Sequence, residues 1–470
     1  MIWNHKKYRV LVMALTLGLA SGFAVCSAAG QGGNAMPPHM NTQGMPPAPP
    51  SGELPPGPPP DGMMGGPDMQ EGKDVSELSA VCAIDGENKV LDGLNLTSES
   101  VDENAVLVRG NGQLTLTNST FSKTGDSSSA DASNFTGQNA VILVHDSTAT
   151  LKNLELTSDA DGANAIFSTG ENSHVTVRNV KIHTKNNSSR GLDATYGGNI
   201  TATDVDITTE GAHCGALATD RGEGNVTVTR GVLHTSGEGS PCIYSTGNIT
   251  VSDSQGEAIG SEIAVVEGKN SITLDNVKLT GHAKHGLMLY QSFSGDADVG
   301  EAHFSAKNSV LTNRSDGPMF YITNTKATAT LEHTTLVQDG DVLINVTSDR
   351  WGNEGSNGGN FAFYGKDQEL QGDVLANSIS TVQLHLSDST HWKGSLNKDN
   401  QAGDASIHLD KSSAWTLTAD SFVTRLTDED NTFSNIRSNG FTIYYDKTQS
   451  DSLNGKTIDL PDGGKLMPME

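Results

Sequence analysis

The stretch Val175-Thr-Val-Arg-Asn-Val-Lys-Ile182 decides the fold, because near copies follow at Ile200-Thr-Ala-Thr-Asp-Val-Asp-Ile207 and Val226-Thr-Val-Thr-Arg-Gly-Val-Leu233. Related phrases begin at positions 114, 149, 249 and 272, and weaker ones at 304 and 329. Successive copies start 35, 26, 25, 26, 23, 23, 32 and 25 residues apart. A period near two dozen residues with two longer exceptions is typical of a solenoid whose coils carry occasional insertions.

Within each phrase, apolar residues alternate with threonine or charged residues at period two, which indicates a strand and not a helix. The fifth position breaks this alternation, and Asn and Asp there tolerate a left-handed backbone and favour a sharp bend. The residues concerned are Asn118, Asn153, Asn179, Asp204, Asp253, Asn276 and Asn308.

A second strand signal precedes each phrase, as in Asn139-Ala-Val-Ile-Leu-Val144 and Asn164-Ala-Ile-Phe167. The predicted unit is therefore three short strands and three turns, with no helical segment. Hairpins would not preserve one phrase in the same place in every unit, whereas coils that stack parallel on one another would. Residues 88 to 445 at about 25 residues per coil predict an all-β parallel β-helix of about 14 coils.

Threonine occupies the second position of the phrase in eight of the nine copies, from Thr115 to Thr330. This predicts an outward column of hydroxyl groups. A second regular column two residues further on would suit ice binding, but charged residues such as Lys152 and Arg178 interrupt it. We therefore expect the column to support the sheet through cross-strand threonine pairs.

The repeated phrase resembles the single-stranded right-handed parallel β-helix of bacterial surface proteins, especially autotransporter passenger domains and adhesin-like proteins. The closing segment strengthens the resemblance, because Leu384-His-Leu-Ser-Asp-Ser-Thr-His-Trp392 is echoed by Ile407-His-Leu-Asp-Lys-Ser-Ser-Ala-Trp415. The resemblance covers roughly residues 85–460 and implies a fold more than an activity. One departure is that only a short tail, from Gly440 to Glu470, follows the last coils, so we expect no C-terminal membrane barrel.

The amino terminus predicts export. A basic start (His5 to Arg9) precedes an apolar run from Val10 to Val25 that is too short and too interrupted to span a membrane. Small residues then suit cleavage after Ala28 or Ala29, while lipidation at Cys26 is a weaker alternative. We expect a signal peptide over 1–29 and an extracellular, cell-surface or periplasmic mature chain with no transmembrane segment.

Twelve of the sixteen prolines lie between Pro37 and Pro67. A segment of this composition cannot join a sheet ladder, so 30–75 is predicted to be a Pro/Gly/Met-rich disordered spacer. The β-helix is then expected over 76–445. The remaining 446–470 is predicted to be a C-terminal tail or cap, because an open last coil would invite pairing with other chains.

The chain of 470 residues carries 30 Lys and Arg against 56 Asp and Glu, a formal net charge of −26. Such acidity argues against nucleic acid and anionic membrane surfaces as partners, since both are polyanions. No P-loop, HExxH or nucleophile-elbow motif occurs. We therefore predict no catalytic residue, no cofactor and no metal site.

Enzymes with the β-helix fold act on polysaccharides through outward carboxylates and basic residues on one face. The candidates here are Arg190 with Asp193, Asp159 with Asp161, Asp220, and His285. They do not recur at one coil position and form no obvious carboxylate pair of the kind that hydrolysis needs. We read them as solvated turn residues, and weak Ca²⁺ binding at Asp159-Ala-Asp-Gly162 lacks the EF-hand spacing.

The cysteines leave a disulfide open. Cys214 and Cys242 fall near the same strand of adjacent coils, and export would permit a bridge. Aligning Thr219 with Thr246 sets the two cysteines one position out of register, which favours free thiols. Cys82 remains outside this pair, and without a CxxC motif we expect no zinc site.

Three excursions interrupt the period, at 122–138, 291–303 and 347–365. Insertions in a solenoid become loops on its flank, where binding often occurs. Trp351 and the nearby Phe361, Phe363 and Tyr364 could stack on a sugar ring or could fill a coil interior, and both readings stay open.

We favour a non-catalytic, exported surface protein of adhesin type that binds glycan or extracellular protein ligands along its flank. Such a protein would use a separate secretion or anchoring partner. The alternative is a polysaccharide lyase or glycoside hydrolase of the pectate-lyase-like β-helix class.

Overall fold

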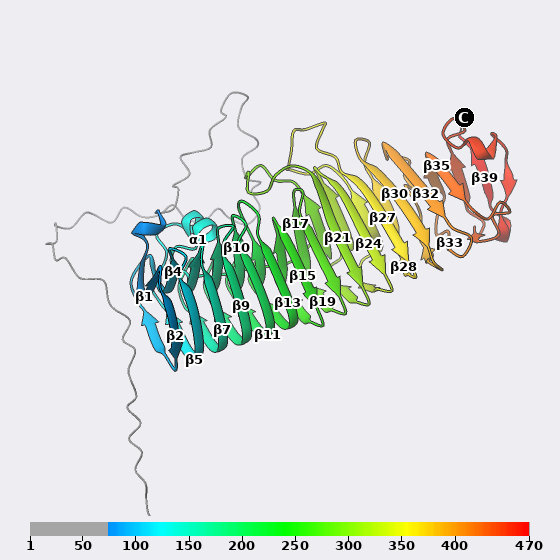
Figure 1. Ribbon diagram of the computed structural model, residues 1–470. Helices are drawn as coiled ribbons and strands as arrows, with labels where there is room; N and C mark the ends of the chain where they lie inside the picture. Colours follow the sequence, from blue (N-terminus) through cyan, green and yellow to red (C-terminus); the bar gives the residue numbers. More distant parts are fainter. Residues whose placement is uncertain (1–73, 470) are drawn as a thin grey trace, which may run out of the picture.

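The computed structural model describes residues 74–469, and the chain winds there into one elongated right-handed parallel β-solenoid of about 16 turns (Figure 1). The expected signal peptide over 1–29 and most of the spacer over 30–75 lie outside the described residues. The coil number is higher than the 14 predicted. Winding begins at residue 79, continues past residue 445, and takes fewer residues per coil near the end, as the 23-residue step from Trp392 to Trp415 shows.

One long face of the solenoid, sheet A, is a continuous ladder of twelve parallel strands. Its strands, in spatial order, are β1 (Ser79–Asp85), β4 (Glu103–Arg109), β6 (Ile142–His145), β8 (Ile166–Thr169), β10 (Leu192–Thr195), β12 (Leu217–Thr219), β14 (Ile243–Ser245), β17 (Ala264–Glu267), β20 (Leu287–Tyr290), β23 (Phe320–Thr323), β26 (Val342–Val346) and β29 (Asp373–Ala376).

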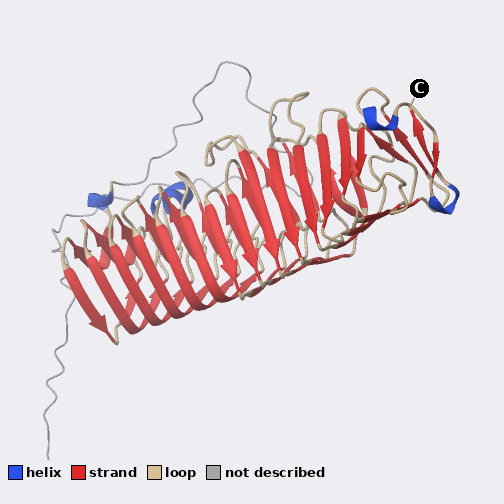
Figure 2. Ribbon diagram, turned by 45° about the vertical axis from the view of Figure 1, so that its right-hand side comes forward, coloured by secondary structure: helices blue, strands red, loops and turns tan. Residues whose placement is uncertain are grey.

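The rest of each coil belongs mainly to sheet B, which contains the repeated phrase. Figure 2 shows the strands of successive coils stacked side by side along the solenoid. Its strands are β2 (Asn88–Asp92), β3 (Asn95–Ser98), β5 (Gln113–Lys123), β7 (Thr148–Ser158), β9 (His174–Thr184), β11 (Asn199–Thr209), β13 (Asn225–Thr235), β15 (Asn248–Ser252), β16 (Gln255–Ala258), β18 (Ser271–Asp275), β19 (Lys278–Gly281), β21 (Glu301–Lys307), β22 (Val310–Asn313), β24 (Lys326–Glu332), β25 (Thr335–Gln338), β27 (Asn360–Lys366), β30 (Thr381–Ser387), β32 (Asp404–Leu409) and β35 (Arg425–Asp428).

Two small sheets complete the carboxyl-terminal coils. Sheet C comprises β28 (Glu369–Gln371), β31 (His391–Lys393), β33 (Ala414–Thr416) and β36 (Ile436–Arg437), and sheet D comprises β34 (Ser421–Val423), β37 (Thr442–Tyr445), β39 (Lys465–Pro468) and β38 (Ile458–Asp459). Beyond residue 445, β39 adds a parallel rung to β37, and β38 then pairs antiparallel with β39.

The predicted register is confirmed, because Ile200 pairs with Val175 on one side and with Val226 on the other. All three side chains are buried in the core that runs through the solenoid. The threonine column is also present, since Thr176, Thr201 and Thr227 stand opposite one another on the exposed face of the same strands. Each coil therefore repeats both the inward apolar positions and the outward hydroxyl positions of the phrase.

The bend predicted at the fifth position is confirmed. Its residue has a positive φ in all nine copies, between 46° at His333 and 58° at Asp204. The side chains then bond along the solenoid: Nδ2 of Asn179 donates to Oδ1 of Asn153 at 2.8 Å, and Nδ2 of Asn153 donates to Oδ1 of Asn118 at 2.8 Å. In each of the strands β5, β7, β9, β11 and β13 the bend lies inside a single eleven-residue strand. The predicted second and third strands of the unit are therefore continuous in these coils.

One excursion differs from the prediction of loops without helix. Within 122–138 the chain forms the short helix α1 (Ala130–Thr136). Ser129 accepts a hydrogen bond from the Ala132 N–H at its start, and Gly137 adopts a left-handed backbone at its end. The other short helices are 3₁₀ turns at Val75–Glu77, Asp451–Leu453 and Pro461–Gly463. None of the helices in residues 74–469 has the length and apolar character needed to cross a bilayer.

Candidate functional site

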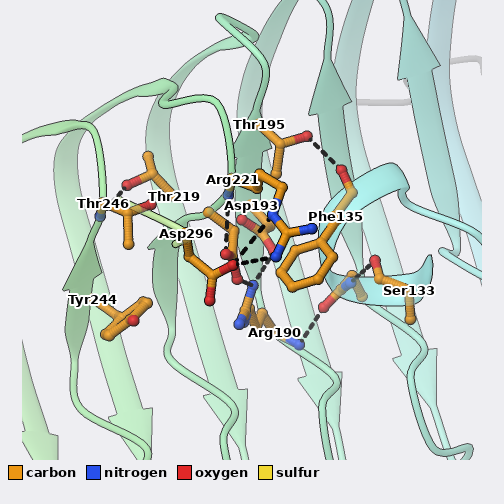
Figure 3. A network of polar contacts seen from close by, with 12 residues as sticks. Ser133, Phe135, Arg190, Asp193, Thr195, Thr219, Arg221, Tyr244, Thr246 and Asp296 are labelled. Atoms are coloured by element: carbon orange, nitrogen blue, oxygen red, sulfur yellow. Dashed lines mark hydrogen bonds and ion pairs between the residues drawn. The ribbon is translucent and has the colours of Figure 1, made fainter. Parts of the chain in front are cut away.

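A buried polar cluster lies on the outer face of sheet A and joins candidate residues from two adjacent coils (Figure 3). Nη1 of Arg190 contacts Oδ2 of Asp193 at 2.8 Å and Oδ2 of Asp220 at 2.6 Å. The two carboxylates come from adjacent coils, because β10 and β12 pair directly. The expectation that these were solvated turn residues is wrong, since the side chains of Asp193 and Asp220 are 0% and 4% exposed.

The local sequence explains this geometry. In Arg190-Gly-Leu-Asp193, alternation turns Leu192 into the core and Asp193 outward. Gly191 is required, because a β-carbon there would lie 2.5 Å from the carbonyl oxygen of Ala216 on the next coil. Arg190 is thereby held close to sheet A, within reach of the carboxylate of Asp220, which directly follows β12.

A second ion pair covers the first. Nη2 of Arg221 contacts Oδ1 of Asp296, which belongs to the 291–303 excursion, at 2.6 Å. The Arg221 guanidinium also lies 3.9 Å from the ring centroid of Phe135 in α1 (Figure 3). Arg221 therefore links the 122–138 and 291–303 excursions to the solenoid next to the cluster.

The protonation of this cluster follows from burial. The pKa of Asp220 is raised to about 7, mainly by burial, with Arg190 lowering it and the charges of Asp193 and Asp296 adding to the increase. Burial also raises the pKa of Asp193, against the opposing effect of Arg190. Burial alone would lower the pKa of Arg190, but its two carboxylate partners outweigh this, so its pKa is raised. Two acids with raised pKa thus share one cation, and both carboxylates are buried.

The other predicted candidates lie elsewhere. His285 packs on Tyr321 with 4.0 Å between ring centroids, and its Nδ1 lies 3.4 Å from Oε1 of Glu262. Burial lowers the pKa of His285 to about 4, so the ring is neutral near pH 7.

Asp159 and Asp161 serve the coil turns. Oδ2 of Asp159 pairs with Lys185 at 3.0 Å, and Oδ1 of Asp161 accepts the backbone N–H of Asn187 at 3.0 Å. Over residues 74–469 no group of three or more His, Cys, Asp or Glu side chains is placed to hold a metal ion. Among the described residues, no set of side chains is therefore placed to form the weak Ca²⁺ site considered for this turn.

Cys214 and Cys242 are buried free thiols. The pairing of Leu217 with Ile243 sets Cys242 opposite Ala216, so the cysteines are two positions out of register and not one. Instead, the backbone N–H of Cys214 donates to Oγ of Ser240 at 2.9 Å. Burial raises the pKa of Cys214 to about 11 and that of Cys242 to about 12, which leaves both unreactive as nucleophiles.

Of the aromatic residues near Trp351, some fill the coil interior and others lie on the flank. Phe361 and Phe363 fill the core, with the Phe320 ring 6.1 and 5.6 Å from theirs. Tyr364 is 36% exposed. Trp351 lies on the flank, with its ring centroid 5.4 Å from Tyr290 and 6.3 Å from Phe293.

A buried carboxylate beneath these rings was missed by sequence reasoning. Glu267 is 1% exposed and accepts hydrogen bonds from the hydroxyls of Tyr244 at 2.6 Å and Tyr290 at 2.7 Å, and from Ser292. Aligning Ala264-Val-Val-Glu267 with Leu287-Met-Leu-Tyr290 would have placed Glu267 and Tyr290 on adjacent rungs, as the structure does. Glu267 thus anchors the start of the 291–303 excursion under Trp351.

The fold and this flank define a right-handed parallel β-helix with loop-borne side chains on the outer face of sheet A. Consistent with this, residues 104–295 match the family model described as right handed beta helix region. No curated protein and no solved structure shows significant similarity to the chain.

Proposed function

We propose that the protein is an exported, non-catalytic β-helix of adhesin type that binds glycan or extracellular protein ligands along its flank. The observation that carries the proposal is the aromatic platform, by which we mean Trp351 and Phe293 together. The two rings come from separate excursions and meet on the outer side of sheet A.

The platform is rigidly supported. The Nδ2 of Asn357, which is 5% exposed, donates to the carbonyl oxygens of Asp349 at 2.6 Å and Trp351 at 2.8 Å. Tyr290 supports the Trp351 ring from below through its bond to Glu267. Such preorganisation lowers the entropy that a binding surface loses when a ligand binds.

The platform also offers suitable chemistry. Phe293 is 51% exposed, and the guanidinium of the exposed Arg350 lies 4.7 Å from the Trp351 ring centroid. An aromatic surface beside an exposed cation suits the C–H faces of sugars and the aromatic or acidic side chains of proteins. Large aromatic side chains and arginine are also the residues that dominate protein interfaces.

The enzymatic alternative rests on Asp193 and Asp220, whose raised pKa values resemble those of acid catalysts. Both carboxylates are nevertheless buried and bound to Arg190. Opening the cluster to a polysaccharide would require the Arg221–Asp296 pair to separate. We therefore favour a binding role over a lyase or hydrolase.

Export is part of the proposal and is supported by the sequence of residues 1–29. Outside a cell, a net charge of −26 would oppose adsorption to polyanions and leave recognition to local contacts. A separate secretion or anchoring partner remains part of the hypothesis.

The test is a glycan and matrix-protein array probed with the wild-type protein and with Trp351→Ala and Phe293→Ala. Binding that either variant reduces at least tenfold supports the proposal. The control is Tyr364→Ala, which removes an exposed ring of β27 that stacks on His385 of β30. No binding to any array component would contradict the proposal, as would release of reducing ends or unsaturated products from acidic polysaccharides.

A further inference from the structure

The backbone ladder of the solenoid is interrupted once on the flank next to sheet C. β22 pairs with β25, and β28 pairs with β31, but within residues 74–469 no register joins β25 to β28. The two coils remain bonded on either side. The His333 N–H donates to the Lys366 carbonyl at 3.1 Å, and the Asp373 N–H donates to the Asp341 carbonyl at 2.9 Å. Two parallel strand edges therefore face each other across a short opening.

A groove of about 830 Å³ lies at this opening, within the range of about 300–1,000 Å³ that is typical of ligand sites. We call it the ladder-break groove. Its walls are Leu336 to Asp341 on one coil and Glu369 to Asp373 on the next, and Lys393, Lys398 and Thr418 complete it.

The backbone around the groove is specialised. The pairing of β26 with β29 shifts register between Val342 and Ile344. Gly372 has a φ of 117°, and a β-carbon there would lie 2.8 Å from the Leu343 nitrogen and 2.9 Å from the Asp341 carbonyl oxygen. Register shifts and glycines of this kind are over-represented where a sheet is shaped for function or where another group approaches the backbone.

The groove offers both hydrogen-bond donors and acceptors. Each open strand edge presents backbone N–H and C=O groups without a ladder partner. Oε1 of Gln338 is buried and has no hydrogen-bond partner among the described residues. Lys393 lines the same wall and contributes an exposed ammonium group.

Two of its carboxylates are neutralised within the protein. Asp373 pairs with Lys398 at 2.7 Å and Asp339 with Arg314 at 2.9 Å, while Oε1 of Glu369 lies 2.7 Å from the imidazole of His391. A site with internally paired charges of both signs favours neither a polyanion nor a polycation. The bonds that close both ends of the opening also prevent a peptide strand from threading through it to complete the ladder.

We propose that the ladder-break groove binds a short neutral oligosaccharide. Sugar hydroxyls both donate and accept hydrogen bonds, so they match the open strand edges, the Gln338 amide and the Lys393 ammonium group. This inference rests on the proposed function, because it names a ligand class for one flank, but it concerns a site separate from the aromatic platform.

The experiment is calorimetric titration of the protein with maltotriose, cellotriose and chitotriose. Val337→Trp introduces a large ring at the groove wall. Val310→Trp makes the same change on the adjacent strand β22, outside the groove, and controls for effects on folding. Circular dichroism confirms that each variant is folded. We expect the wild type to bind at least one trisaccharide, Val337→Trp to weaken it at least tenfold, and Val310→Trp and Trp351→Ala to leave it unchanged.

Two results would overturn the inference while sparing the proposed function. One is that Trp351→Ala abolishes trisaccharide binding and Val337→Trp does not, which would place the sugar on the platform. The other is that the wild type binds no trisaccharide but binds array components through Trp351. If the wild type binds nothing on the array and none of the trisaccharides, both proposals are overturned.

Discussion

Asp193 and Asp220, which come from adjacent coils, bind the same nitrogen atom of Arg190 at 2.8 and 2.6 Å. Three buried ionisable groups thus join two rungs of the solenoid beside the contacts that Phe135 and Asp296, from two excursions, make with Arg221. Because the carboxylates outnumber the cation they share, the arginine is the member of the cluster whose loss would be most costly.

Arg190→Met is therefore expected to destabilise the protein by roughly 3–5 kcal/mol, because two buried carboxylates would lose their cation. The matched control is Arg230→Met, which breaks the exposed inter-coil pair of Arg230 with Asp204 and should change stability little. Urea unfolding followed by circular dichroism measures both. Equal midpoints for the two variants would show that the buried cluster contributes no more than a surface pair.

The asparagine ladder gives a second prediction. Asn179 has a φ of 53° and bonds to Asn153. Asn179→Val should destabilise the protein by about 1–2 kcal/mol or more, since a β-branched residue is strained in left-handed backbone and the ladder bond is lost. Asn179→Gly removes the same bond but keeps the backbone conformation accessible, so it should cost less. If glycine proved as harmful as valine, the ladder bond and not the bend would be the dominant contribution.

These two features differ in how far the sequence could predict them. The bend, the register and the columns of like residues follow from the repeated phrase, because each coil pairs with its neighbour at the same offset. Arg190, Asp193 and Asp220 belong to no repeated position, so their meeting depends on side-chain direction and on the burial that the excursions create. Periodicity carries no information on either.

The helix α1 and the break between β25 and β28 were also not predictable from the repeat, whereas the alignment of β17 with β20 could have placed Glu267 beside Tyr290. Each occurs where the period of the chain is interrupted or where one coil differs from its neighbours. The sequence left open whether Trp351, Phe361 and Phe363 lie on the flank or in the coil interior. Trp351 lies on the flank, whereas Phe361 and Phe363 belong to the core, because alternation along β27 turns them inward.

Thiol reactivity provides a third prediction. Burial raises the pKa of Cys214 and of Cys242, so a thiol reagent at pH 8 should modify neither in the native protein and both after unfolding. Peptide mapping by mass spectrometry identifies the modified residues. A peptide linking Cys214 to Cys242, or rapid modification of either in the native protein, would contradict the buried, out-of-register placement.

The imidazole of His285 gives the last prediction, a dependence of stability on pH. Its folded pKa is lowered to about 4 from the unfolded value of 6.5, mainly by burial, with Glu262 and Asp349 acting in the opposite direction and Lys284 adding to the effect. Between these two pH values the unfolded chain binds more protons than the folded one. The contribution of His285 to stability is therefore complete above about pH 6.5 and is lost as the pH falls toward 4.

The variant His285→Phe keeps a ring against Tyr321 but cannot titrate. The difference in unfolding free energy between wild type and variant should then rise by up to about 3 kcal/mol from pH 4 to pH 6.5, and stay constant above that. Taking the difference removes the titrations that both proteins share, such as that of Asp220. Urea unfolding at half-unit pH intervals measures it, and parallel profiles for the two proteins would mean that His285 is protonated as readily in the folded state as in the unfolded chain.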